Sequence, residues 1–175
     1  AAGRTGSAAL QLGKAMGATV IAVVRNDDQK HFCITQGADY VLNSADEDLV
    51  EKVLNLTQQN GVNVIYDTVG GAAQRSVIET IAYKGRLILV GFAGGGWPKI
   101  DPLHIMFKGY AVMGALNTIR TEGEKQSAIE VLNNMIANSK ITPAHAKVFN
   151  FDETQMAMSE LGHSGGIAVK INVEL

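Results

Sequence analysis

Short apolar segments rich in β-branched residues alternate with segments of helical period along most of this chain, and this alternation restricts its fold more than any other feature. The apolar segments are residues 18–24, 38–42, 62–66, 86–90 and 110–116. Continuous apolar strands of this length are typical of a parallel sheet that is buried on both faces. We therefore expect these segments to be strands of the parallel-sheet type.

The intervening segments carry helix signals. One apolar helix face runs through residues 8–16, with Gly17 as its stop, and a second helix opens at Asp27 or Asp28 and ends at Gly37. Ser44 and Glu47 fit a capping box, and residues 72–82 form a further helix. The alternation predicts right-handed crossovers and an α/β fold: a Rossmann-type, doubly wound parallel sheet in a three-layer αβα arrangement.

The last third of the chain has a different pattern. It predicts a long helix over 122–139, an extended segment over 141–150, a helix over 152–161 and a strand over 167–173. No linker rich in Pro, Gly or Ser separates this part, and 175 residues suit one domain. We therefore assign residues 1–175 to a single domain.

Charge and cysteine content exclude several classes of protein. The formal net charge is −2 and no basic stripe is present, so we expect neither a nucleic-acid partner nor a membrane partner. Cys33 is the single cysteine, which excludes an internal disulfide framework and a cysteine-cluster zinc site. The four histidines have no partners at metal-ligand spacing. These features favour a reducing, cytoplasmic location.

The chain opens with a glycine-containing turn that leads directly into a helix. This segment fits a pyrophosphate-binding turn made of Gly3, Arg4, Thr5 and Gly6, with alanine in the first glycine position. Gly3 would let the main chain approach the pyrophosphate, and Gly6 would let the helix pack closely on the sheet. A phosphate at this place would meet backbone N–H groups and the positive end of a helix dipole.

The end of the next strand bears on the type of cofactor. An acidic residue there accepts from the ribose 2′-hydroxyl of NAD, whereas this strand ends in Arg25, a planar cation suited to a 2′-phosphate. Lys30 would add a second charge. Asp27 and Asp28 lie close by in the sequence and are able to accept from a ribose. The pattern favours NADP(H), with NAD(H) as the alternative.

Several blocks, in order, resemble one family across nearly all 175 residues. Residues 1–18 resemble its stretch AAGGVG…QLAKAxGA, and HFCITQGADYVLN at 31–43 resembles AELARALGADHVIN. GVNVIYDTVGG at 61–71 and YKGRLILVGFAGG at 83–95 match two further signatures, and SGGIAVKINVEL closes the chain as GGHIGKVVLKV does. The family is the medium-chain dehydrogenases/reductases of the zinc-type alcohol dehydrogenase superfamily, in the branch similar to NADPH:quinone oxidoreductases.

That resemblance implies a set of cofactor contacts. It places residues of the opening turn at the pyrophosphate, two cations at the adenosine phosphate, and residues after the fourth and fifth strands over the cofactor and near the nicotinamide. In that order, they are Gly3, Arg4, Thr5 and Gly6; Arg25 and Lys30; Asp67, Thr68 and Val69; Gly91, Phe92 and Ala93. The plain alternatives are a strand-end turn for Asp67 and a core position for Phe92. Arg4 and Thr5 depart from the family's Gly-Val, and Val169 replaces a glycine before Lys170.

The resemblance also implies parts that this chain lacks. The sequence starts inside the turn, so we expect it to be a fragment without the first strand and without a preceding, barrel-like catalytic domain that contributes most substrate contacts and any zinc ligands. In the order 3-2-1-4-5-6 the first strand is central, so its absence predicts two half-sheets. Residues 120–175 would pack toward the catalytic domain. We expect the 175-residue chain alone to be inactive, and the sequence leaves open whether the parent binds zinc.

Three functions follow as hypotheses. The first is the cofactor-binding part of an NADPH-dependent enzyme that transfers hydride to or from a quinone, enone, alcohol or aldehyde. The second is a non-catalytic nucleotide-binding module, and the third is a methyltransferase-like fold, against which Arg25 argues. No Tyr-x-x-x-Lys pair and no P-loop are present in the sequence.

The apolar segment 110–116 bears on assembly. It follows the fifth strand and is expected at the sheet edge, where a second copy would pair with it and make a homodimer. The alternative is a monomer in which the loop 94–102 covers that edge.

Overall fold

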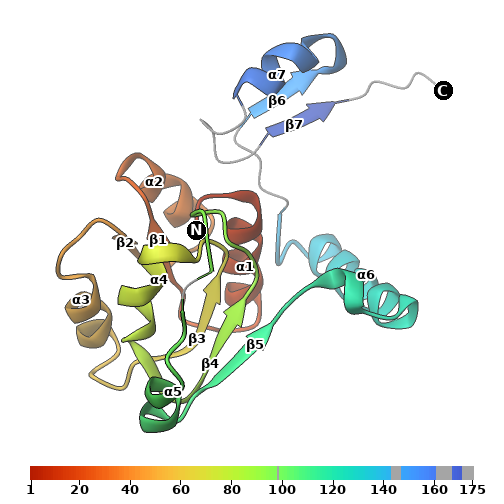
Figure 1. The fold of residues 1–175 in the computed structure, drawn as a ribbon. Helices are drawn as coiled ribbons and strands as arrows, with labels where there is room; N and C mark the ends of the chain where they lie inside the picture. The colour runs from red at the N-terminus through yellow and green to blue at the C-terminus, as the bar shows by residue number, and fades with distance from the viewer. Residues whose placement is uncertain (98, 143–146, 161–166, 171–175) are drawn as a thin grey trace. The chain divides into compact units, whose positions relative to one another are not determined.

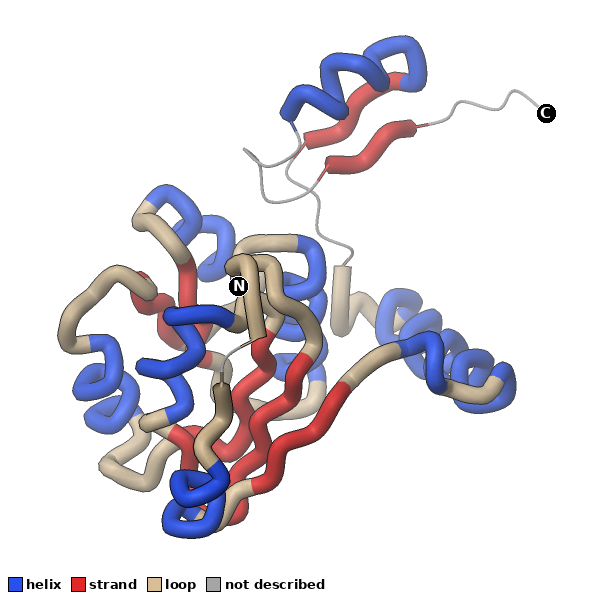
Figure 2. Tube along the Cα trace, viewed as in Figure 1, coloured by secondary structure: helices blue, strands red, loops and turns tan. Residues whose placement is uncertain are grey.

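The computed structural model describes residues 1–97, 99–142, 147–160 and 167–170, and helices alternate with strands along the first 114 residues (Figures 1 and 2). In chain order the elements are α1 (Arg4–Ala15), β1 (Ile21–Val24), α2 (Asp28–Thr35), β2 (Tyr40–Asn43), α3 (Leu49–Leu56), β3 (Val62–Asp67), α4 (Gly71–Ile78), β4 (Ile81–Leu89), α5 (Pro102–Lys108), β5 (Ala111–Gly114), α6 (Glu122–Ala137), β6 (Lys147–Asn150), α7 (Thr154–Glu160) and β7 (Ile167–Lys170). The predicted α/β fold is confirmed.

The chain divides into two compact units. The first unit comprises Ala1–Val41 with Asn134–Leu175, and the second comprises Leu42–Asn133.

The described strands fall into separate sheets. β1 pairs with β2, and β3, β4 and β5 form a three-stranded sheet in that order, side by side in Figure 1. The three strands are parallel, with Ile65 opposite Leu87 and Leu87 opposite Val112. β5 is therefore the last strand of its sheet, where the sequence placed it. A third sheet consists of β6 and β7, which are also parallel.

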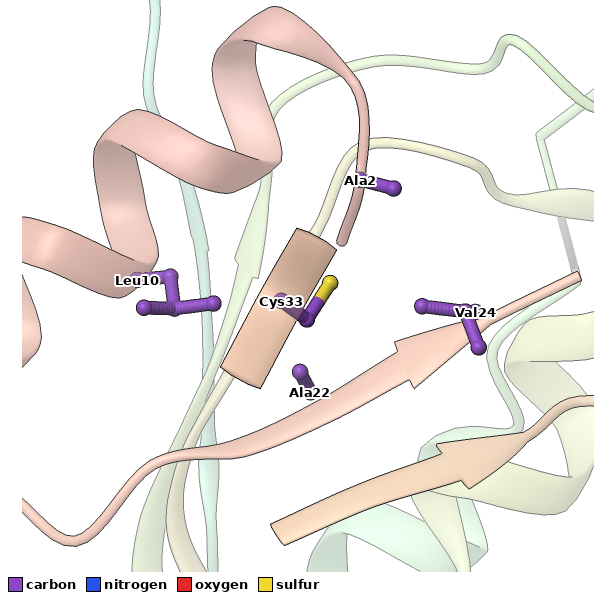
Figure 3. Packing of buried hydrophobic residues seen from close by; sticks show 5 residues of the cluster. All are labelled: Ala2, Leu10, Ala22, Val24 and Cys33. Carbon is purple, nitrogen blue, oxygen red and sulfur yellow. The ribbon is translucent and has the colours of Figure 1, made fainter. Parts of the chain in front are cut away.

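The core of the first unit forms between α1, β1 and α2. Leu10 of α1, Ala22 and Val24 of β1, and Cys33 of α2 are all buried, and Ala2 joins them from the opening turn. Figure 3 shows the Cys33 side chain lying among these neighbours. Alternate residues of β1 point to this cluster, which is the two-residue period of a strand. The cluster holds the opening turn against the end of β1.

The core of the second unit lies on its three-stranded sheet. Ile65 of β3, Leu87 of β4 and Tyr110 before β5 are buried together with Ile81, and apolar side chains of α4 and α5 pack on them. Leu87, in the central strand, is fully buried. This core fixes where β3 and β4 end, which is where the candidate site of this unit lies.

Helix ends show which local predictions were right. Gly17 and Gly37 follow α1 and α2 with φ of +85° and +96°, the left-handed backbone of a C-terminal stop. The Ser44–Glu47 capping box was wrong, because α3 begins at Leu49 after Asp48 and no side chain caps it. The helix predicted over 72–82 ends at Ile78, since Ile81 is buried as the first residue of β4.

The C-terminal elements were predicted in kind and differ in their limits. α6 matches the helix expected over 122–139, and a single 3₁₀ turn, Phe151–Glu153, precedes α7. The predicted segments 141–150, 152–161 and 167–173 each lie partly outside the described residues. No helix in the described part of the chain has the length and apolar character needed to cross a membrane.

Candidate functional site

The opening turn places an uncapped helix end at the surface. Gly3 is the N-cap of α1, in extended conformation with φ −78° and ψ 170°, and it has no side chain to bond the first-turn N–H groups. The first turn of α1 also contains no acidic side chain. The positive end of the α1 dipole is thus left for an anion from outside the helix.

Two glycines of this turn differ in what surrounds them. A Cβ built on Gly3 meets no heavy atom within 4 Å, so a ligand has room to approach the main chain there. A Cβ on Gly6 would lie 2.5 Å from the carbonyl oxygen of Ala1. Position 6 therefore requires glycine because the backbone of Ala1 lies against it. The sequence had instead suggested that Gly6 allows the helix to pack closely on the sheet. The turn has the space and the donors that a phosphate needs.

Ala1 ties this turn to β1. Its nitrogen donates to the carbonyl oxygen of Val23 at 2.6 Å, so the turn begins beside the penultimate residue of the strand. Arg25 follows the end of β1 directly. The turn and Arg25 are in this way held at the same strand end of the first unit.

The two predicted cations at this end differ in their partners. Arg25 is exposed; its backbone N–H donates to Gln29 Oε1 at 3.2 Å, and no salt bridge among the described residues involves its guanidinium. Lys30 Nζ lies 2.9 Å from Asp27 Oδ1. A 2′-phosphate would therefore meet Arg25 directly, whereas Lys30 would have to leave its carboxylate.

In the second unit, Asp67 organises the turn after β3. It is 9% exposed, and its Oδ1 accepts the N–H groups of Val69 and Gly70, each at 2.9 Å. This is the strand-end turn that the sequence offered as the plain alternative for Asp67. The turn presents Thr68, half-buried, and Val69, which is exposed.

The loop after β4 is bonded onto that turn. Gly91 N–H donates to the Asp67 carbonyl at 3.3 Å, and Ala93 N–H donates to the Thr68 carbonyl at 3.3 Å. The structure therefore brings residues 67–69 and 91–93 together, as the predicted site requires. Phe92 is 54% exposed, so the alternative that placed it in the core was wrong.

The predicted residues thus form two groups, one on each unit. Gly3, Arg4, Thr5, Gly6, Arg25 and Lys30 belong to the first unit, and Asp67, Thr68, Val69, Gly91, Phe92 and Ala93 belong to the second. In the second group, the turn after β3 and the loop after β4 lie at the carboxyl ends of parallel strands, the usual place of ligands in such sheets. In the first group, Arg25 directly follows β1, the opening turn leads into the start of α1, and Lys30 lies within α2.

Sequence reasoning missed three residues beside the second group. Arg75, Trp97 and Lys99 line a cavity next to the loop after β4. The signal that the sequence offers for them is the indole and the cation that follow glycines 94–96.

Cys33 is fully buried, and burial raises the pKa of its thiol, so it packs as a small apolar residue. Among the described residues, no group of three or more His, Cys, Asp or Glu side chains is placed to hold a metal ion.

Known proteins are similar to this chain in sequence and in fold. The family model described as zinc-binding dehydrogenase matches residues 5–134. An NAD-dependent alcohol dehydrogenase of Sulfolobus acidocaldarius is 34% identical over 92% of this chain and 45% of its own length. Quinone oxidoreductase-like protein 2 of Bos taurus is also 34% identical, over 65% of this chain and 33% of its own.

Among solved structures, Escherichia coli quinone oxidoreductase in complex with NADPH matches with a TM-score of 0.81 and 26% identity, over 96% of this chain and 54% of that one. The chain spans between a third and about half the length of these relatives. The family model covers most of the chain, and the relatives carry the names that the sequence blocks predicted. The chain therefore belongs to the zinc-binding dehydrogenase family of medium-chain dehydrogenases/reductases.

Proposed function

We propose that this chain is the dinucleotide-binding domain, residues 1–175, of an NADP(H)-dependent oxidoreductase of the cytoplasm. The observation that carries the proposal is the opening turn, where an uncapped helix end, open space over Gly3 and a close crossing at Gly6 together suit a pyrophosphate. Family membership supports it. When bound, the dinucleotide supplies or accepts a hydride, and the chain's residues hold it in place.

Each group of residues has a role in this proposal. Gly3, Arg4, Thr5 and Gly6 bind the pyrophosphate, and Arg25, assisted by Lys30, binds the adenosine 2′-phosphate. Thr68, Val69, Gly91, Phe92 and Ala93 contact the nicotinamide half, and Asp67 positions them, because its carboxylate holds the turn to which the loop after β4 is bonded.

The choice of NADP(H) over NAD(H) rests on Arg25. The relatives do not decide it, since one is named NAD-dependent and another is solved with NADPH. A charge-assisted contact between a guanidinium and a phosphate contributes about 1.5–3 kcal/mol. We therefore expect NADPH to bind this chain roughly ten- to a hundredfold more tightly than NADH.

Calorimetric titration of the chain with NADPH and NADH tests this choice. Arg25→Gln should abolish most of the preference, whereas Arg120→Gln, which removes the same charge from another exposed arginine, should leave it unchanged. Equal dissociation constants for the two cofactors in the unaltered chain would contradict the assignment to NADP(H). Absence of binding of either cofactor would contradict the function itself.

The reaction of the intact parent is part of the same proposal. We assign it hydride transfer between NADPH and a quinone or enone, or an alcohol or aldehyde, with most substrate contacts and any zinc ligands supplied by residues outside this chain. Because hydride transfer needs the substrate held close to the nicotinamide, we expect the 175-residue chain to show no NADPH oxidation with a quinone or an aldehyde. Turnover by the purified chain would contradict this division of roles.

The partner proposal is a homodimer through residues 110–116. β5 ends its sheet, and Met113 and Leu116 beside it are 49% and 59% exposed. Ala115 N–H donates to the Leu89 carbonyl, so by alternation the N–H of Val112 points away from β4, toward a partner strand. An apolar, unpaired edge of this kind is a site for pairing with a second copy.

Light scattering at micromolar protein tests the dimer. Val112→Pro removes the outward N–H and keeps the bonds to β4, whereas Val112→Ala trims the side chain and keeps the N–H. We expect a dimer for the unaltered chain and the alanine variant, and a monomer for the proline variant. A monomeric unaltered chain would favour the alternative in which the loop 94–102 covers the edge.

A further inference from the structure

A cavity of about 440 Å³ opens beside the loop after β4, entirely within the second unit. Its lining consists of Arg75 from α4, Trp97 and Lys99 from the loop, and the glycines 71 and 94–96. Two walls are thus cationic, one is an indole, and the remainder is bare backbone. Among the residues that the structure describes, no acidic side chain belongs to this lining.

The backbone of the cavity is held in place by main-chain bonds. Gly71 N–H donates to the Gly96 carbonyl at 2.9 Å, and Gly94 N–H donates to the Val69 carbonyl at 2.8 Å. A Cβ on Gly94 would lie 2.9 Å from that same carbonyl oxygen, so the approach requires glycine. The loop is pinned to the turn after β3, and a ligand would find the cavity already formed.

The two cations in the lining are available to a ligand. Arg75 and Lys99 are both exposed, and neither pairs with a carboxylate among the residues whose side chains the structure describes. Lys30, Lys52 and Lys108, by contrast, each have a carboxylate partner. Two cations that share one small cavity favour an anion, and a guanidinium offers a carboxylate two parallel donors.

The indole adds a second recognition element. The rings of Trp97 and Phe92 pack with centroids 4.9 Å apart at an interplanar angle of 52°. Trp97 is still 54% exposed, so much of its surface remains for a flat apolar group. Phe92 itself belongs to the loop segment that we assign to the nicotinamide half of the cofactor.

We propose that the cavity of Arg75, Trp97 and Lys99 binds a small planar organic anion, in which a carboxylate lies between the two cations and an aromatic or conjugated body lies against the indole. The volume suits such a molecule. Resting on the function proposed above, the inference names the substrate class: conjugated or aromatic carbonyl compounds that carry a carboxylate. A neutral quinone or a simple alcohol would leave both cations without a partner.

Trp97 reports on the cavity directly, because it is the only tryptophan of the chain. The full chain is titrated with benzoate and with benzamide, which share a ring and differ in charge, at constant ionic strength. We expect benzoate to change the Trp97 fluorescence in a saturable way. We expect benzamide, which lacks the charge, to bind at least about tenfold more weakly than benzoate. Arg75→Gln and Lys99→Gln should each weaken benzoate binding severalfold, whereas Arg120→Gln should not change it.

Three results would overturn the proposal. They are equal binding of benzoate and benzamide, unchanged benzoate binding in both cavity variants, and displacement of benzoate by inorganic phosphate at equal concentration, which would mark an anion site without aromatic selectivity. Displacement of benzoate by NADPH would overturn the substrate assignment, since the anion would then be the cofactor's own. Circular dichroism confirms that each variant is folded.

The same titrations separate this inference from the proposed function. NADPH binding without benzoate binding would end the inference alone. Benzoate binding without binding of either dinucleotide would end the proposed function and the substrate assignment, and would leave the cavity as an anion site.

Discussion

Gly70 is a position at which one added methyl group should be costly to this chain. It follows the Asp67 turn with φ +64° and ψ −152°, a backbone conformation that only glycine adopts without strain. A Cβ there would also lie 2.7 Å from the carbonyl oxygen of Gly96. That carbonyl accepts the N–H of Gly71, so Gly70→Ala strains the turn and displaces the loop that the turn holds.

The magnitude follows from these two effects. A non-glycine residue in this conformation costs on the order of 1–3 kcal/mol. Loss of the Gly71–Gly96 hydrogen bond adds about 0.5–1.5 kcal/mol. The free energy of unfolding of the second unit should therefore fall by about 2–4 kcal/mol, a large part of the 5–15 kcal/mol of an ordinary domain.

Urea unfolding followed by Trp97 fluorescence measures this loss, since Trp97 and Gly70 lie in the same unit. With a slope of about 1–3 kcal/mol per molar urea, the midpoint should fall by roughly 1–2 M. Gly96→Ala is the matched control, because it changes the other partner of the contact. A Cβ on Gly96 meets no heavy atom within 4 Å. The free energy of unfolding of the Gly96→Ala variant should therefore equal that of the unaltered chain or exceed it by up to about 1 kcal/mol.

The reasoning would be refuted if Gly70→Ala and Gly96→Ala had the same midpoint. It would also be refuted if Gly70→Ala lowered the free energy of unfolding by less than about 0.5 kcal/mol, the usual range of a surface substitution.

Two further predictions concern the first unit. Lys14 Nζ lies 2.7 Å from Asp39 Oδ1, and Lys14 together with the Val20 N–H lowers the pKa of the Asp39 carboxyl. The ionised Asp39 therefore stabilises the fold at pH values above its unfolded-state pKa of about 3.9, and this stabilisation is lost as the pH falls through the lower folded-state pKa. Asp39→Asn should thus lower the melting temperature at pH 7 and converge with the unaltered chain in acid, whereas Glu47→Gln should match it throughout; a gap that persists in acid would argue against the ion pair. Cys33, fully buried and with its pKa raised by burial, should react with iodoacetamide far more slowly in the native chain than in urea, and equal rates would show that its packing is wrong.

The sequence by itself determined the features that depend on local period and on single residues. Alternating β-branched and helical segments specify an α/β fold, because side-chain period decides which face of each element is buried. Gly17 and Gly37 end their helices because they supply positive φ, which other residues adopt at a cost. The separation of β1 and β2 from the sheet of β3, β4 and β5 agrees with the half-sheets expected from the family's strand order.

Only the tertiary structure decided the features that depend on contacts between distant segments. Gly6 is required by its close approach to Ala1, Asp67 has its carboxylate bonded to the turn, and Phe92 packs on Trp97 while it remains exposed. The cavity that joins Arg75 to Lys99 exists because main-chain bonds fix one loop on another. Such bonds carry no signature in the types of residues involved, since every residue except proline has the same backbone donor and acceptor.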